Sequence, residues 1–154
     1  MQEGIIVMKK YFVFIMGEKR FAVPMLEVEE VVLPIEISVI PEQEKCLKGV
    51  VNLRGEIVTV VDIKIKLGLG ETSIIDRKTC FVIFNLEGHK VAVMVDEVED
   101  VVQMEETEIK DVRDLRKTKF VEGIYRTKND QLILIANTRK LLEIDLLEKI
   151  RNAA

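Results

Sequence analysis

An internal repeat is the feature that most constrains this chain. Residues 21–32 read FAVPMLEVEEVV and residues 91–102 read VAVMVDEVEDVV, and seven of the twelve positions are identical at an offset of 70. The similarity extends upstream, where FVFI at 12–15 matches FVIF at 81–84. A repeat of this kind constrains the architecture more strongly than the helix or strand propensities of individual residues do.

A second pair of segments supports the first. Residues 48–62 read KGVVNLRGEIVTVVD and resemble residues 122–137, EGIYRTKNDQLILIAN. The offset is 74 at Gly49/Gly123 and 75 at Asp62/Asn137, close to that of the first pair. The simplest account is one unit, duplicated within the chain.

Short runs of Val, Ile and Phe between turn residues predict that each copy consists mainly of strands. The expected strands are 11–16, 19–23, 50–53, 57–61, 79–84, 90–95, 124–126 and 132–136. In residues 25–32 and 95–102, apolar residues recur every three positions instead of every two. This change predicts a bend or a single helical turn before a further strand. We therefore expect a mainly β fold with about five strands per copy, arranged as an antiparallel barrel or sandwich.

Two short helical segments are expected at equivalent ends of the copies. Asp62 would cap a helix over 63–67 that ends at Gly68, and Asn137 or Thr138 would cap a final helix to about Arg151. We predict one domain over 1–154. It comprises a first subdomain over about 11–68, a linker over 69–77, a second subdomain over 78–137 and a C-terminal helix over 138–151.

Charge and hydropathy exclude several partners. The 154 residues carry a net charge of -4, so no basic field is available for nucleic acid or an anionic bilayer. No apolar run approaches the roughly 18 residues of a membrane span. The first lysines follow a short apolar stretch, the reverse of a signal peptide, so we expect a cytoplasmic protein without direct membrane insertion. Cys46 and Cys80 form no CxxC pair and fit a reducing compartment.

The sequence is poor in catalytic groups. His89 is the only histidine and lies in an expected hairpin turn, and no nucleophile or phosphate-binding motif is present. The acidic residues between 96 and 108 lack the spacing of an EF-hand and suit a solvated face. We predict no catalytic residue, no metal ligand and no cofactor. The alternative, a cleft in which the acidic run binds a metal ion, would show activity or thermal stabilisation with divalent ions.

The two copies differ at one tight turn. The segment 52–56 reads NLRGE, whereas the second copy has RTKND at 126–130. Arg54 at the tip of this turn would present a planar donor fork suited to a carboxylate. On the residues alone, Arg54 is either a binding residue or a solvated side chain.

These segments together resemble the CheW family of bacterial chemotaxis coupling proteins. The similarity covers about residues 10–147 and centres on the NLRG motif at 52–55, with FAVP at 21–24 and VEEVV at 28–32 before it and VMVDEVEDV at 93–101 after it. The resemblance implies two SH3-like five-stranded β-barrels packed together, with short helices. Little sequence lies outside the similar region, with no kinase-like or receiver-like segment, so we expect a stand-alone coupler and not a module attached to a kinase.

The family resemblance further implies a non-enzymatic adaptor role and a set of site residues. The adaptor would join the cytoplasmic tip of methyl-accepting chemotaxis receptors to the regulatory domain of the histidine kinase CheA. The receptor helix would lie in an apolar groove between the barrels. The implied receptor-binding residues are Phe12, Met25, Val28, Glu30, Val31, Arg54 and Val98. Gly49 is expected near the kinase-binding face. The alternative is a generic two-barrel interaction module for another helical or kinase partner.

Overall fold

The computed structural model describes residues 5–71, 77–114 and 119–144. Its elements in chain order are β1 (Met8–Met16), β2 (Lys19–Pro24), the 3-10 turn η1 (Met25–Glu27), β3 (Val28–Val32), β4 (Leu47–Leu53), β5 (Glu56–Val61), α1 (Ile63–Lys66), β6 (Cys80–Leu86), β7 (His89–Val95), β8 (Glu97–Glu105), the 3-10 turn η2 (Glu106–Glu108), β9 (Lys110–Asp111), β10 (Val121–Arg126), β11 (Leu132–Ala136) and α2 (Thr138–Leu141). The predicted mainly β fold is confirmed. Each of the eight expected strands is present, with ends within three residues of those expected.

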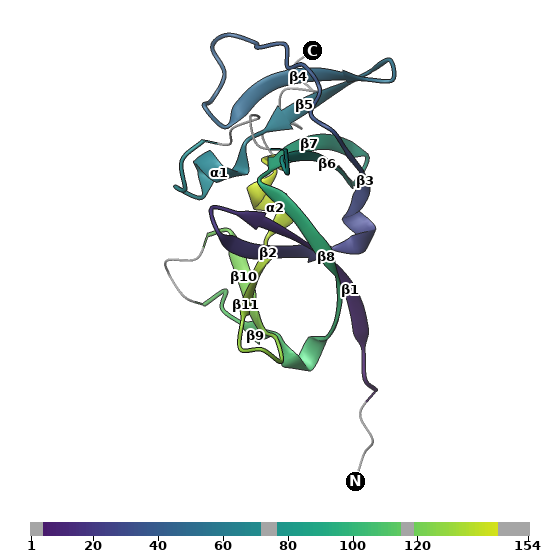
Figure 1. Cartoon of the computed structure of the whole chain (residues 1–154), viewed down its shortest axis with the longest axis vertical. Coiled ribbons are helices and arrows are strands. Elements are labelled where there is room, and N and C mark those ends of the chain that lie inside the picture. Colours follow the sequence, from purple (N-terminus) through teal and green to yellow (C-terminus); the bar gives the residue numbers. More distant parts are fainter. Residues whose placement is uncertain (1–4, 72–76, 115–118, 145–154) are drawn as a thin grey trace.

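The strands form two curved sheets that lie one above the other along the long axis of the molecule (Figure 1). One sheet has the order β8-β1-β2-β11-β10-β9 and the other the order β3-β6-β7-β5-β4. Each order has two edge strands, so hydrogen bonds do not close either sheet into a complete barrel. The two-residue strand β9 adds a sixth strand to the first sheet, beside the five that were expected.

Each sheet contains strands from both copies of the repeat. The β1–β2 hairpin of the first copy lies between β8 and β11 of the second, and the β6–β7 hairpin of the second lies between β3 and β5 of the first. At these junctions β2 runs parallel to β11, and β7 runs parallel to β5. The predicted division at 11–68 and 78–137 therefore follows the sequence repeat, whereas the sheets combine the two halves.

The β1–β2 and β6–β7 hairpins, each of which pairs with strands of both copies, are called the exchanged hairpins. Burial on both faces explains why these hairpins are so apolar. Along β1, Tyr11 and Val13 point into the core of the six-stranded sheet, while Phe12 and Phe14 point into a core shared by the two sheets. Strand β6 alternates in the same way between the shared core and the core of the five-stranded sheet. Strands covered on both faces are expected to be continuously hydrophobic rather than alternating. The two hairpins thus form the centre of the molecule.

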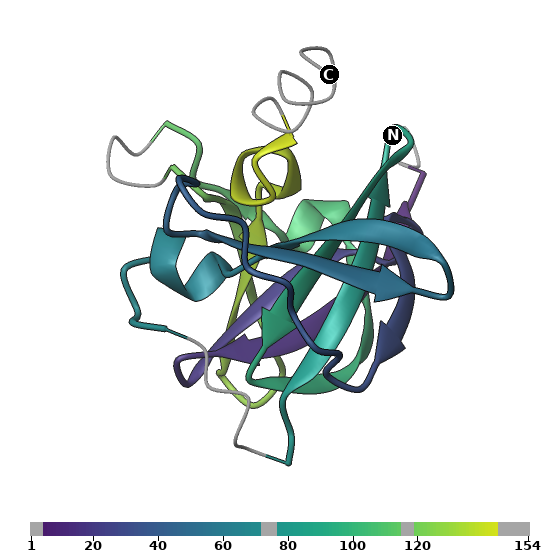
Figure 2. The same cartoon turned by 90° about the horizontal axis from the view of Figure 1, so that it is seen from above.

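The ends of the two copies show the same cap. The Asp62 carboxylate accepts a hydrogen bond from the Lys64 amide at 3.0 Å, and the Asn137 side chain accepts one from the Lys140 amide at 3.2 Å. Both predicted N-caps are confirmed. They begin the equivalent helices α1 and α2, which lie beside the shared core (Figures 1 and 2).

The prediction of one continuous helix over 138–151 is wrong at its start. Helix α2 ends at Leu141, and Glu143 has a left-handed backbone with φ of 57°. Leu142 and Glu143 form a turn that interrupts the helix before Ile144, and Leu141, Leu142 and Ile144 are all buried in the shared core. The rest of the predicted helix, 145–151, lies outside the described residues.

Candidate partner-binding surface

Strands β3 and β8 are equivalent in the repeat, and each is an edge strand of its sheet. Val28 in β3 and Val98 in β8 are partly buried against the shared core, and so is Met25 in η1. Val31 is 41% exposed. These four residues, Met25, Val28, Val31 and Val98, are called the central apolar surface below. All four are apolar receptor-binding positions that the family resemblance implies, and Phe12 is the fifth.

Phe12 lies under this surface rather than on it. Its side chain is 5% exposed and its ring centroid is 6.3 Å from that of Phe14 in the shared core. Met25, Val28 and Val98 pack against the same core. Phe12 therefore shapes the central apolar surface from below and has almost no area to offer a partner directly.

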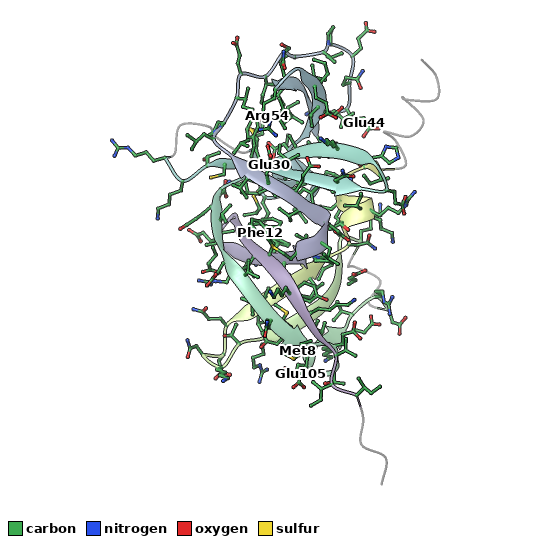
Figure 3. All side chains as sticks on the ribbon, turned by 90° about the vertical axis from the view of Figure 1, so that its right-hand side faces the viewer. Met8, Phe12, Glu30, Glu44, Arg54 and Glu105 are labelled. Atoms are coloured by element: carbon green, nitrogen blue, oxygen red, sulfur yellow. The ribbon has the colours of Figure 1, made fainter. Side chains whose placement is uncertain are left out.

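The remaining two predicted receptor-binding residues form an ion pair. Arg54 Nη2 donates to both carboxylate oxygens of Glu30, at 2.6 and 2.8 Å, and the two side chains meet above the five-stranded sheet (Figure 3). The Arg54 side chain is 65% exposed. An exposed pair of this kind contributes about 0–1 kcal/mol to stability, so holding the fold together does not account for it.

The turn that carries Arg54 has a defined geometry. Arg54 and Gly55 have φ values of 52° and 87°, the left-handed conformation that a two-residue type I′ hairpin requires. The Gly55 amide donates to Asn52 Oδ1 at 2.7 Å, which holds the turn closed. The NLRG motif thus fixes the backbone from which Arg54 projects.

The Arg54–Glu30 pair belongs to the first copy alone among the described residues, whereas another ion pair occurs in both. Arg20 Nε contacts Glu99 at 2.8 Å, and the equivalent Lys90 Nζ contacts the equivalent Glu29 at 3.2 Å. Both glutamates occupy register shifts in β8 and β3. Hydrogen bonds, first from Asn85 and then from Lys90, lower the pKa of Glu29 below its usual value.

Gly49 is buried beneath the chain segment that contains Ser38. Its φ is 141°, and a Cβ at this position would lie 2.2 Å from the Ser38 carbonyl oxygen. The neighbouring residue Val50 pairs with Ser38 through amide-to-carbonyl hydrogen bonds of 2.8 and 2.9 Å. Gly49 therefore lets the 37–38 segment lie along the edge of β4.

The sequence interpretation missed three exposed apolar residues in or beside these strands. Leu26 in η1 is 98% exposed, Leu33 after β3 is 76% exposed, and Val101 in β8 is 41% exposed. Val101 is the repeat equivalent of Val31 and has the same exposure, so the alignment of the copies could have identified it. Leu26 aligns with Asp96 and Leu33 with Gln103, so the repeat carries no signal for either.

One cluster of potential metal ligands occurs in the described ranges, and its charge is already compensated. Single ligand atoms of Glu44, Cys46 and Glu143 lie within 4.8 Å of one another. The Lys66 ammonium forms an ion pair with Glu143. Burial raises the pKa of the Cys46 thiol, which opposes formation of the metal-binding thiolate. In the described residues, no helix has the length and apolarity needed to cross a membrane.

These features define a small β protein built from a duplicated unit, with an apolar surface at the junction of its two sheets and one exposed arginine–glutamate pair beside it. The family model for the CheW-like domain matches residues 10–145. The chain therefore belongs to the CheW-like domain family.

Individual relatives agree with this assignment. The chemotaxis protein CheW of Klebsiella aerogenes is 24% identical over 154 residues, which cover 98% of this chain and 92% of that protein. The chemotaxis protein CheW of Bacillus subtilis is 32% identical over 101 residues, covering 66% and 64% of the two chains. The crystal structure of the scaffolding protein TtCheW from Thermoanaerobacter tengcongensis has 32% identity and a TM-score of 0.77, and the match covers 85% of this chain and 90% of that one.

Proposed function

We propose that this protein is a non-enzymatic adaptor in the cytoplasm that couples methyl-accepting chemotaxis receptors to the histidine kinase CheA. Its membership of the CheW-like domain family supports a scaffold role in chemotaxis. The observation that carries the receptor half of the proposal is the central apolar surface, three of whose four residues lie in the first copy together with the Arg54–Glu30 pair.

The receptor half of the proposal uses helix-in-groove recognition. Apolar positions on one face of the receptor helix pack on the valines of β3 and β8, and an acidic side chain of the helix meets Arg54. Both hydrogen bonds from Arg54 to Glu30 use Nη2. The Nε and Nη1 hydrogens have no acceptor among the described residues, so the guanidinium can bind a second carboxylate without releasing Glu30.

The kinase half of the proposal concerns the β4 edge of the five-stranded sheet. Gly49 and the Ser38 segment shape this edge, and Val39 and Ile57 nearby are 77% and 65% exposed. The regulatory domain of CheA would bind these exposed apolar side chains. The effect of Gly49 on kinase binding would then be indirect, through the position of the segment that covers it.

An Arg54→Glu variant tests the receptor half. We expect calorimetric titration with a soluble receptor signalling fragment to show at least about tenfold weaker binding, because hot-spot energy concentrates in a few anchors and the substitution opposes two carboxylates. The melting temperature should stay within about 2 °C of wild type, since an exposed ion pair adds little stability. Binding to the CheA regulatory domain should be unchanged.

Lys128→Glu is the matched control, because Lys128 is an exposed cation in the corresponding turn of the second copy and the charge change is identical. Its receptor affinity should remain within about twofold of wild type. Equal receptor affinity for wild type and Arg54→Glu would contradict the proposed site. Binding of wild type to neither partner would favour a generic interaction module with the same fold.

A further inference from the structure

A cationic pocket lies where α1 approaches α2, away from the central apolar surface. Its volume is about 280 Å³. Its lining residues are Lys66, Lys119, Phe120, Arg139, Lys140 and Glu143. Four of these side chains are cationic and one is a carboxylate, in a chain whose net charge is -4. Positive charge is therefore concentrated here against the overall charge of the protein.

Lys66 builds the floor of this pocket. Its side chain is only 9% exposed and forms an ion pair with Glu143. Its ammonium also donates to the Lys140 carbonyl oxygen at 2.5 Å and lies 4.9 Å from the centroid of the Phe120 ring. These contacts join α1 of the first copy to α2 and the 119–120 segment of the second, so the cations around the floor are held on a fixed framework.

The rim of the pocket presents cations toward solvent. Lys119 and Lys140 are exposed, and neither ammonium group has an acceptor in the part of the chain that the structure describes. Arg139 is partly exposed and contacts Glu87 at 2.6 Å. Two lysines and an arginine beside a buried, already paired lysine form a surface that attracts an anion with several charges.

We propose that this pocket binds an acidic segment of a protein partner, one with at least two neighbouring carboxylate side chains. A volume of about 280 Å³ accommodates one or two side chains and falls below the usual 300–1,000 Å³ of a site that encloses a small molecule. The sequence has no glycine-rich phosphate-binding motif, so backbone amides do not add the recognition that nucleotide sites use.

The location makes this site independent of the proposed receptor surface. Helix α1 lies on the opposite side of the molecule from β3 in both views (Figures 1 and 2). An acidic segment bound between α1 and α2 would leave Arg54 and the valines of β3 accessible. The pocket thus adds a third contact to an adaptor with two proposed binding faces.

The test uses the full chain and a fluorescein-labelled hexaglutamate peptide, with binding followed by fluorescence anisotropy. We expect saturable binding at about 50 mM NaCl that weakens strongly by about 300 mM, because exposed charge pairs are screened. Lys119→Glu combined with Lys140→Glu should weaken binding at least about tenfold. The matched control, Lys19→Glu with Lys128→Glu, carries the same charge change on exposed lysines and should change affinity less than threefold.

Equal weakening by the two double variants would overturn the proposal, because the effect would then follow net charge and not the pocket. Displacement of the peptide by millimolar inorganic phosphate, with no displacement by the same concentration of glutarate, would overturn it in favour of a phosphate ligand. Circular dichroism should show the same melting curve for all variants. Unchanged affinity of the pocket variant for the receptor fragment would separate this site from the receptor surface.

Discussion

The two halves of the repeat share the contacts that hold the fold and differ in the contacts proposed for recognition. Both halves place a doubly buried hairpin in the sheet of the other half, and both begin a short helix with a capping side chain. The tight turn with Arg54 and its pairing with Glu30 occur in the first half, whereas the second half has a longer turn closed by Thr127 and Gln131. Features present once are therefore the better guide to specific binding.

The repeated ion pairs sharpen this comparison. Arg20–Glu99 and Lys90–Glu29 each join an exchanged hairpin to the edge strand of the same sheet, with 2.8 and 3.2 Å between charged atoms. Their presence in both halves indicates a role in aligning the strands. The Arg54–Glu30 pair has no such counterpart among the described residues, which is consistent with a role in partner recognition.

The largest effect on stability is expected from replacing the two equivalent glycines, Gly49 and Gly123, with alanine. Gly49→Ala would place Cβ 2.2 Å from a backbone oxygen, whereas Gly123→Ala would place it 2.6 Å from the Cγ2 methyl of the Ile109 side chain. A side chain can rotate away and a backbone carbonyl cannot, and only Gly49 also has a positive φ. We expect losses in unfolding free energy of about 3 kcal/mol for Gly49→Ala and about 1 kcal/mol for Gly123→Ala. Urea denaturation checks the order, and a larger loss for Gly123→Ala would contradict it.

A smaller effect on stability is expected from replacing the equivalent glutamates Glu27 and Glu97 with glutamine. Burial raises the pKa of Glu27, and its Oε2 atom has no hydrogen-bond partner within the described residues. Because the folded state favours the protonated acid, the stability contribution of Glu27 falls as pH rises from about 4.5 through its folded pKa. Glu27→Gln should therefore raise the unfolding free energy at pH 7 by about 1 kcal/mol.

The gain in unfolding free energy from Glu27→Gln should shrink as pH falls toward 4.5. The wild-type carboxyl is then protonated in the folded protein and is neutral, like the glutamine amide. Glu97→Gln is the control, since Glu97 is 39% exposed and lies 3.7 Å from the Lys78 ammonium. It should change stability by less than about 0.5 kcal/mol at pH 7. Thermal unfolding from pH 4.5 to 8 measures both variants, and a pH-independent gain for Glu27→Gln would refute the assigned cause.

The smallest effect is expected on receptor binding, when Val31 and Val101, two valines with equal exposure, are each replaced with serine. Val31 and Val101 are each 41% exposed at the same repeat position, but only the β3 side carries the Arg54–Glu30 pair. Val31→Ser should weaken receptor-fragment binding about threefold to fivefold, and Val101→Ser less than twofold. Titrations of the two variants measure the difference. Equal losses would mean that both halves contribute equally to the receptor surface.

Much of the fold could be predicted from residues that make local contacts. The strands were found because their Val, Ile and Phe runs end at turn residues, and Asp62 and Asn137 were identified as caps because their side chains precede short helices. Arg54 was identified because its turn differs between the copies. Each of these inferences depends on a few neighbouring residues.

The exchange of hairpins could not be predicted, because it depends on which strands pair over long sequence separations. The runs at 12–15 and 81–84 show that these strands are apolar, but burial against two cores instead of one follows only from the three-dimensional arrangement. The end of α2 at Leu141 was missed for a similar reason, since buried contacts of Leu142 and Ile144 override helix propensity. The burial of Phe12 beneath the candidate surface was also invisible in the sequence.

The most direct test of the coupling proposal is sedimentation velocity on a mixture of this protein, a receptor signalling fragment and the CheA regulatory domain. If the receptor and kinase surfaces are separate, the mixture should form a complex that contains all three proteins. The Arg54→Glu variant should leave only the complex with the kinase domain. Mutually exclusive binding of the two partners, or loss of both with Arg54→Glu, would contradict an adaptor with two independent faces.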